Sequence, residues 1–155
     1  DMIGRAVDFS GKELHSKSVQ VNIGANQSRS YLKLKRSELV DEASEKNVAV
    51  VVQLKTGSEL LTENILFLKN PKDLSLEKPG IKIDIVKNND GYKIELNCDK
   101  LCKDVYLSMD EEGFFTDNYF DMIPGVTKKI ELKTKTDIPD IENKIKIVSL
   151  FDSYN

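Results

Sequence analysis

The sequence predicts an all-β chain built from two antiparallel β-sandwich domains in tandem. Apolar and polar residues alternate with a period of two along most of the 155 residues, which is the pattern of half-buried strands. A sustained apolar stripe with helical period is missing from the sequence. The short strand-like runs are separated by Gly, Pro, Asn and Asp turn signals, as is typical of antiparallel sandwiches rather than of folds with crossover helices.

Three segments of the first half are predicted to be strands, namely residues 18–24, 31–35 and 47–54. The inward-facing positions of the first two are Val19, Val21, Ile23, Leu32 and Leu34. In the third, Ala49 and Val51 make the second face apolar as well, so we expect that strand to be buried on both faces. Residues 35–46 lack an apolar stripe and are predicted to form a loop with at most one or two helical turns.

The second half continues the alternation in residues 81–85, 92–98, 105–109, 128–133 and 144–151. Between the first two of these segments lies the sequence KNNDG, which contains the dipeptide Asp90-Gly91. This dipeptide predicts a tight hairpin, because glycine accepts the positive φ that such turns require.

One segment, residues 69–80, carries two prolines and a glycine, and we expect the domain junction within it, at residues 71–78. The predicted domains are residues 1–72 and 73–155. Strand-like sequence begins almost at residue 1, so we expect the first domain to be incomplete at its N-terminus. The chain would then be a piece of a longer protein, and its partners would be the upstream domains of the same polypeptide.

The composition argues against two classes of partner, nucleic acids and membranes. The apolar fraction of 39% is that of an ordered globular chain. A net charge of −3 offers no basic face, so we expect no nucleic-acid partner. We expect no membrane partner either, because no apolar run approaches the ~20 residues that span a bilayer.

The residues that most often carry chemistry are sparse. Cys98 and Cys102 form a single C-x-x-x-C pair with no histidine nearby, too few ligands for a zinc site. We interpret them as two small buried or half-buried thiols, with a local disulfide as the alternative. His15 is the only histidine and is expected to be exposed in a polar turn. No catalytic, metal-binding or cofactor-binding residue is predicted, and no cofactor.

The segment Phe114–Gly125 gathers four aromatic residues between a turn and a strand. It does not form a calcium loop, because Gly113 stands at the fourth and not the sixth place counted from Asp110. A sugar-stacking platform is one interpretation of the aromatic residues. We favour a β-corner that closes the core, in which Asp117 and Asn118 bond to the backbone. The packing residues would be Phe115, Tyr119 and Phe120, and Pro124 and Gly125 would form a type II turn. In a strand, Phe115 and Tyr119 share one face and Phe120 takes the other, so at least one of the three must face a different layer.

The sequence DNYFDMIPG in this segment resembles the D-N-Y/F-F-D-L-x-P-G signature near the C-terminus of β-mannosidases of glycoside hydrolase family 2. The preceding residues, from KDVYLSM onward, are similar to the last immunoglobulin-like domain of that family. Upstream, DFSGKEL, VQVNIGAN and TGSELLTENILFLKNPKDLSL are similar to the domain before it. Met122 and Ile123 replace the commoner leucines and Val126 stands where Glu is usual, and none of these changes alters the turn.

This resemblance implies two tandem immunoglobulin-like domains at the end of a long exo-acting hydrolase that removes β-linked mannose with retention. In that family both catalytic Glu residues lie in an upstream (β/α)₈ barrel, and no motif around them occurs in this chain. The fragment itself is therefore expected to be non-catalytic. A β-mannoside or manno-oligosaccharide would be a partner of the longer protein only, for which the family implies secretion, the periplasm or the lysosome.

Three alternatives stay open at the level of sequence. The chain could be a carbohydrate-binding module, an adhesion domain unconnected to an enzyme, or the same region of another family 2 exo-glycosidase. A sandwich fold does not choose among them, because sandwiches host many functions.

Overall fold

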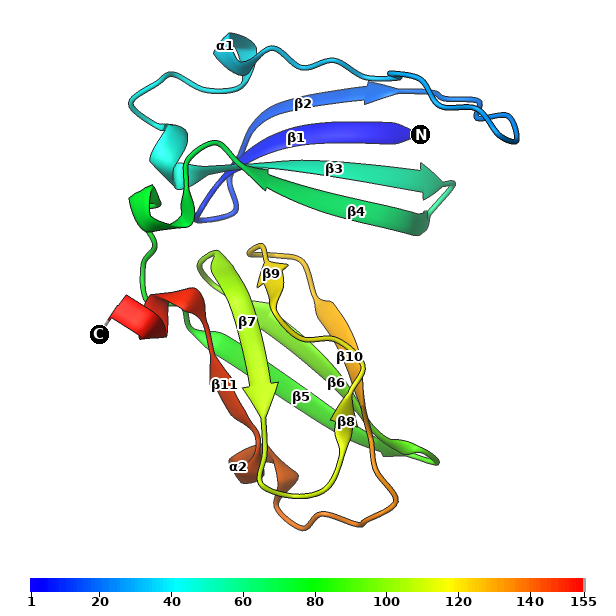
Figure 1. The fold of residues 1–155 in the computed structure, drawn as a ribbon, viewed down its shortest axis with the longest axis vertical. Coiled ribbons are helices and arrows are strands. Elements are labelled where there is room, and N and C mark those ends of the chain that lie inside the picture. Colours follow the sequence, from blue (N-terminus) through cyan, green and yellow to red (C-terminus); the bar gives the residue numbers. More distant parts are fainter. Residues whose placement is uncertain (155) are drawn as a thin grey trace. The chain divides into compact units, whose positions relative to one another are not determined.

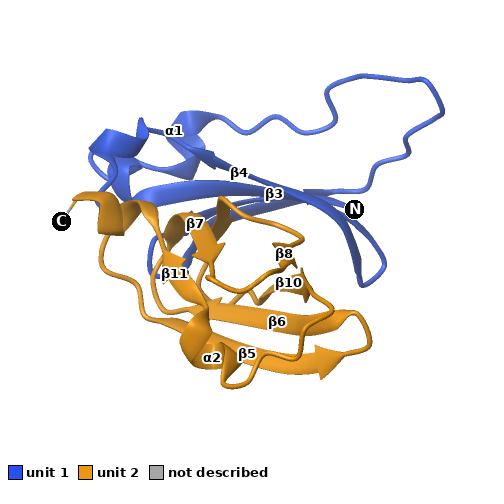
Figure 2. Ribbon diagram, turned by 60° about the horizontal axis from the view of Figure 1, so that its bottom comes forward, with its two compact units in different colours: residues 1–75 blue, residues 76–155 orange. Residues whose placement is uncertain are grey.

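The structure is a computed structural model that describes residues 1–154, and it divides into a first unit, Asp1–Ser75, and a second unit that begins at Leu76 (Figure 2). Nearly all regular structure is antiparallel β-strand, which confirms the predicted fold class. The helical elements are short: α1 (Arg36–Leu39), α2 (Ile141–Lys144), and the 3₁₀ turns η1 (Glu45–Asn47), η2 (Pro71–Asp73) and η3 (Leu150–Tyr154). Among the described residues, no helix is long and apolar enough to cross a membrane.

The first unit holds one four-stranded sheet with the order β2-β1-β3-β4 (Figure 1). Its strands are β1 (Met2–Asp8), β2 (Glu13–Val19), β3 (Val48–Thr56) and β4 (Glu59–Phe67). The central strand β3 is apolar at both parities, and its first four residues, Val48–Val51, are all buried. The prediction of a strand buried on both faces is therefore confirmed.

The segment between β2 and β3 differs from the prediction. Strand β2 ends at Val19, and residues 20–35 are irregular, so the strands predicted at 18–24 and 31–35 were wrong. Leu32 and Leu34 nevertheless face inward, since both lie against Gly4 of β1. Alternation gave the direction of these side chains, but a strand also requires a partner for its backbone, and these residues pair with none.

His15 lies in β2, opposite Ala6 of β1, and not in a turn as predicted. It is half-buried, so the expected exposure was wrong as well. The reason is that β2 is an edge strand with polar residues at both parities. Edge strands carry such residues without showing a hydrophobic period.

The second unit consists of two sheets (Figure 1). One has the order β5-β6-β10-β8 and comprises Ile81–Asn88, Gly91–Cys98, Lys128–Lys133 and Phe114–Phe115. The other has the order β11-β7-β9 and comprises Lys146–Val148, Cys102–Ser108 and Phe120–Met122. Ile130 and Leu132 of β10 are buried while the residues between and beside them are exposed or half-buried, so each strand of the first sheet has one core face and one outer face.

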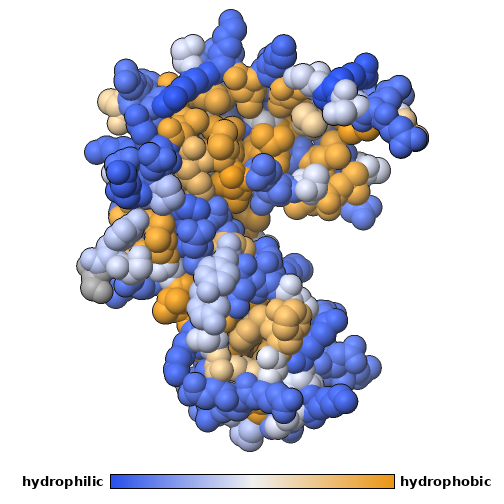
Figure 3. All heavy atoms as spheres, viewed as in Figure 1, coloured by the Kyte–Doolittle hydropathy of each residue, from blue (hydrophilic) through white to orange (hydrophobic). Residues whose placement is uncertain are grey.

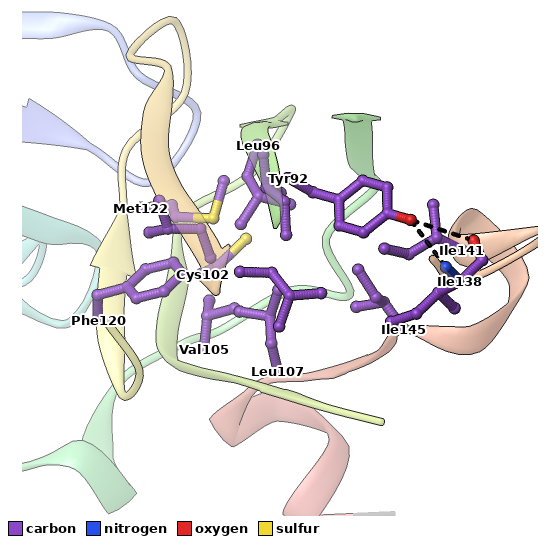
Figure 4. Close-up of a cluster of buried hydrophobic side chains, with 13 residues drawn as sticks. Tyr92, Leu96, Cys102, Val105, Leu107, Phe120, Met122, Ile138, Ile141 and Ile145 are labelled. Carbon is purple, nitrogen blue, oxygen red and sulfur yellow. Dashed lines mark hydrogen bonds between the residues drawn. The ribbon is translucent and has the colours of Figure 1, made fainter. Parts of the chain in front are cut away.

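The core of this unit is one cluster that draws on both sheets (Figure 4). Its buried members are Tyr92, Ile94, Leu96, Cys102, Val105, Leu107, Phe120, Met122, Ile130, Leu132, Ile138, Ile141 and Ile145. Burial of each aliphatic side chain of this size contributes about 1.5–3 kcal/mol relative to exposure. The Tyr92 hydroxyl accepts a hydrogen bond from the Ile138 backbone N–H at 2.9 Å, which fixes the segment after β10 against the end of the cluster (Figure 4).

The β5–β6 hairpin is present, but its turn is not centred on Asp90-Gly91. Asn88 pairs with Gly91, so the loop residues are Asn89 and Asp90, and the Asn88 side chain accepts a hydrogen bond from the Asp90 N–H. Gly91 has a φ of +137° and is the first residue of β6. A Cβ at this position would lie 2.1 Å from the Leu132 carbonyl oxygen, so glycine is required here by the close approach of β10.

Candidate functional site

The corner that precedes β9 is built around Asn118. Its Oδ1 accepts a hydrogen bond from the Leu107 N–H at 2.6 Å, and its Nδ2 donates to the Leu107 carbonyl oxygen at 2.9 Å. Asp117 accepts from the Asn118 N–H and from the Lys128 ammonium. These bonds confirm the predicted roles of Asp117 and Asn118 at the bend.

The turn after β9 also follows the prediction. The Val126 N–H donates to the Ile123 carbonyl oxygen at 3.1 Å, and Gly125 between them has a φ of +78°. This is the geometry of a type II turn with Pro124 at its second position. The sequence IPG is therefore explained by the type II turn that these residues form.

The aromatic residues of the corner divide between core and surface. Phe120 is buried in the core cluster, and Phe115 is half-buried and packs against it. Tyr119 is 69% exposed and stacks on Tyr106, with ring centroids 4.9 Å apart. As predicted, the three aromatic residues do not share one face, but the strand period would have grouped Tyr119 with Phe115. The φ of +58° at Tyr119 breaks the strand and turns this side chain outward.

Phe114 marks a different feature. It is 66% exposed and lines a groove of about 850 Å³. The groove is formed by the tip of the β5–β6 hairpin, residues 87–92, the turn before β8, residues 112–114, and the loop after β10, residues 133–137. These three segments meet at one end of the second unit, at the bottom of Figure 1.

A polar network supports one wall of this groove. The Lys87 ammonium lies 2.7 Å from Asp137 Oδ1, and the Tyr92 hydroxyl donates to the same oxygen at 3.1 Å. The ammonium, followed by the hydroxyl, lowers the pKa of Asp137, and the same contact raises the pKa of Lys87. Asp137 is therefore ionised and held in place at neutral pH.

The second unit also contains a pair of carboxylates that share one cation. Lys103 Nζ lies 3.1 Å from Asp104 Oδ1 and 3.5 Å from Asp121 Oδ1. Burial raises the pKa of Asp121, as it does for the general acids of glycosidases. Asp121 Oδ1 also accepts the Asp104 backbone N–H at 2.9 Å, and neither aspartate lines the groove. The pair is thus a structural link between β7 and β9.

The two cysteines are free thiols, as the first interpretation expected, with Cys102 buried and Cys98 half-buried. A hydrogen bond between them lowers the pKa of Cys98 and raises that of Cys102. Among the described residues, no group of His, Cys, Asp and Glu is arranged to hold a metal ion.

Sequence reasoning missed a buried glutamate in the first unit, Glu45, which is paired with two partly exposed cations. The Glu45 carboxylate is bonded by the Arg36 guanidinium and lies 3.1 Å from the Lys69 ammonium, and these contacts lower its pKa to about 2. Glu45 lies at the end of the segment predicted to be a loop, where the sequence gives no sign of its burial. Only the packing of residues 36, 45 and 69, which are distant in sequence, reveals its burial.

Exposed apolar residues of the first unit do not form a comparable site. On the face shown in Figure 3, apolar side chains gather over the strands of this unit, and its large exposed residues are Leu14, Ile23, Leu60, Leu61 and Leu66. Exposed aliphatic side chains of this kind occur on most proteins and provide no polar groups to orient a ligand. The groove beside Phe114 is therefore the candidate binding site.

Comparison with known protein families finds a match for each of the two units. Residues 76–153 match the family model of the mannosidase Ig-fold domain, and residues 4–73 match that of the mannosidase Ig/CBM-like domain. The chain thus consists of two immunoglobulin-like domains in tandem. No curated protein sequence matches it.

Among solved structures, the chain is similar to the crystal structure of a β-D-mannosidase from Dictyoglomus thermophilum, with a TM-score of 0.81 and 23% sequence identity. The match covers 96% of this chain and 18% of the other. At this identity the likeness establishes the fold of the two units. The chain spans less than a fifth of the length of that protein.

Proposed function

Because the chain belongs to the family of mannosidase Ig-fold domains, we propose that it is a non-catalytic accessory region of a longer retaining exo-β-mannosidase. The observation that carries this proposal is the tandem order of the two family matches, which together take up residues 4–73 and 76–153. The longer protein would hydrolyse terminal β-D-mannose residues. Its upstream domains would be the partners of this chain.

The contacts of three carboxylates, Asp104, Asp121 and Asp137, support a non-catalytic role for these acids. A retaining glycosidase needs two carboxyl groups about 5–5.5 Å apart on either side of the scissile bond, with room for a sugar between them. Asp104 and Asp121 are both paired with Lys103, and Asp137 is bonded to Lys87 and Tyr92. These acids are engaged in holding the fold.

The proposal predicts that the chain alone does not hydrolyse an aryl β-mannoside. The purified 155-residue chain and its Asp121→Asn variant should both release aryl alcohol at the rate of buffer. Asp121 is the acid to test, because burial raises its pKa. Turnover that co-purifies with the chain and is lost in the variant would contradict the proposal.

The longer protein is open to a separate test. Its upstream sequence should encode a (β/α)₈ barrel with two glutamates placed for retaining hydrolysis. If the sugar pocket of that barrel preferred glucosamine over mannose, this chain would be the accessory region of another exo-glycosidase of the same family. An upstream region without a barrel would leave the chain an independent sandwich module.

A further inference from the structure

We propose that the groove beside Phe114 binds a neutral carbohydrate chain, with the Phe114 ring as the surface on which one pyranose ring stacks. This would be a binding site in the second unit, in addition to any substrate pocket of the longer protein. The proposal rests on the geometry of the groove and does not depend on the activity of that protein.

The floor of the groove is one row of residues across the outer face of a sheet. Asn88 pairs with Gly91, Gly91 with Lys133, and Lys133 with Phe114, so the four residues follow one another across β5, β6, β10 and β8. Gly91 contributes no side chain to this row, and its backbone is buried by the close approach of β10. Phe114 closes the row, and because Phe115 packs into the core, the ring of Phe114 must face the other way.

Around this floor, the groove offers hydrogen-bonding groups that the fold does not use. Within residues 1–154, six lining side chains form no hydrogen bond or ion pair, namely Asn89, Asp90, Glu112, Lys133, Lys135 and Thr136. They include donors, acceptors and groups that are both. A flat ring edged by such groups fits a ligand with an apolar face and a rim of hydroxyls, which is the structure of a pyranose.

The charges of the groove favour a neutral ligand. Three lysines line it, Lys87, Lys133 and Lys135, together with three acids, Asp90, Glu112 and Asp137. Lys87 and Asp137 are paired with each other, so two charges of each sign remain for a ligand. Because these charges cancel, neither a phosphate nor a multivalent cation would be attracted by a net charge in the groove. The hydroxyls of a sugar can donate hydrogen bonds to the acids and accept them from the lysines.

The depth of the groove sets the expected strength of binding. Phe114 and the unpaired polar residues are exposed, so a bound ring would keep one face in water. At the low binding energy per atom of shallow sites, one sugar ring binds with a Kd on the order of millimolar.

The test uses the ¹⁵N-labelled 155-residue chain titrated with β-1,4-mannotriose, with cellotriose and trigalacturonate as comparison probes. We expect saturable amide shifts confined to residues 87–92, 112–114 and 133–137. Phe114→Ala and Phe114→Leu should each weaken binding by at least about tenfold, and Phe114→Tyr should retain it, since stacking needs a flat ring. Tyr119→Ala is the matched control, because this residue is equally exposed and lies outside the groove, and it should leave affinity unchanged.

Three results would overturn the proposal. The first is the absence of saturable shifts with either neutral trisaccharide up to about 20 mM, well above the millimolar range expected for a shallow site. The second is stronger binding of the anionic trigalacturonate. The third is a loss of affinity in Tyr119→Ala with affinity intact in Phe114→Leu, which would move sugar binding to the Tyr106–Tyr119 pair.

Discussion

Asn118 gives Leu107 the backbone pairing that a neighbouring strand would otherwise provide. Its amide accepts from the Leu107 N–H and donates to the Leu107 carbonyl oxygen, as a paired residue in a sheet does. One side chain thereby continues the ladder of β7 beyond Val105, where pairing with β9 stops. The left-handed Tyr119 then redirects the chain so that Phe120 enters the core.

At the residue scale, Phe120→Ala should destabilise the second unit strongly. Truncation of a buried aromatic costs about 3–5 kcal/mol, and in a domain of this size that lowers the Tm by more than about 10 °C. Tyr119→Ala is the control at the adjacent position, where only a stacked and exposed ring is lost. Thermal unfolding of both variants measures the difference, and equal changes in Tm would mean that the corner does not close the core.

The candidate site was only partly predictable from these residues. The turn at Pro124 and Gly125 and the roles of Asp117 and Asn118 follow from local chemistry, and the structure confirms them. The exposure of Tyr119 was missed because counting alternate residues assumes an unbroken strand. The groove could not be predicted from the sequence, because it is formed by three segments that are distant along the chain. The available sign of it was that Phe114 and Phe115 are adjacent, so in a strand one of the two rings must face away from the core.

The strands differ in how well the alternation of apolar and polar residues predicts them. Strands β5, β6 and β10 have one apolar face toward the core, and the sequence predicts them well. Strand β2 was missed because an edge strand with polar residues has no hydrophobic period. Residues 31–35 show the opposite case, in which alternation marks side-chain direction in a segment that pairs with no strand.

Where two elements approach closely, a glycine determines whether they can pair. Gly91→Ala should weaken the contact between β6 and β10, because the added methyl would lie 2.1 Å from the Leu132 carbonyl oxygen. Gly125→Ala is the matched control, since its φ is also positive but no atom lies within 4 Å of the added methyl. The control should lose about 1–2 kcal/mol for its backbone conformation alone.

Denaturant unfolding compares the two glycine variants. A larger loss for Gly91→Ala supports the close approach of the two strands as the reason for glycine. If both variants lost the same stability, the backbone conformation would account for both positions. The Gly91 variant should also alter the groove, because this residue lies in the row between Asn88 and Lys133.

At the scale of the whole molecule, the two units differ in how their cores are built. The second unit encloses its main cluster between two sheets, with 13 buried residues and seven half-buried ones around them. The first has a single sheet, and nine of its described apolar residues are buried, namely Ala6, Val7, Phe9, Leu39, Val48, Ala49, Val50, Val51 and Leu74. Its outer strands, β2 and β4, each have one edge without a partner strand among the described residues.

This difference predicts that the units differ in autonomy. Residues 76–155 expressed alone should fold and protect the amides of β6, β7 and β10 from exchange, because their core cluster lies within the unit. Residues 1–75 expressed alone should exchange faster and self-associate, since free strand edges pair with other chains. Hydrogen exchange and sedimentation of each half test this. Equal protection in the two halves would contradict this prediction. It would show that the single sheet of the first unit is as stable alone as the two-sheet second unit.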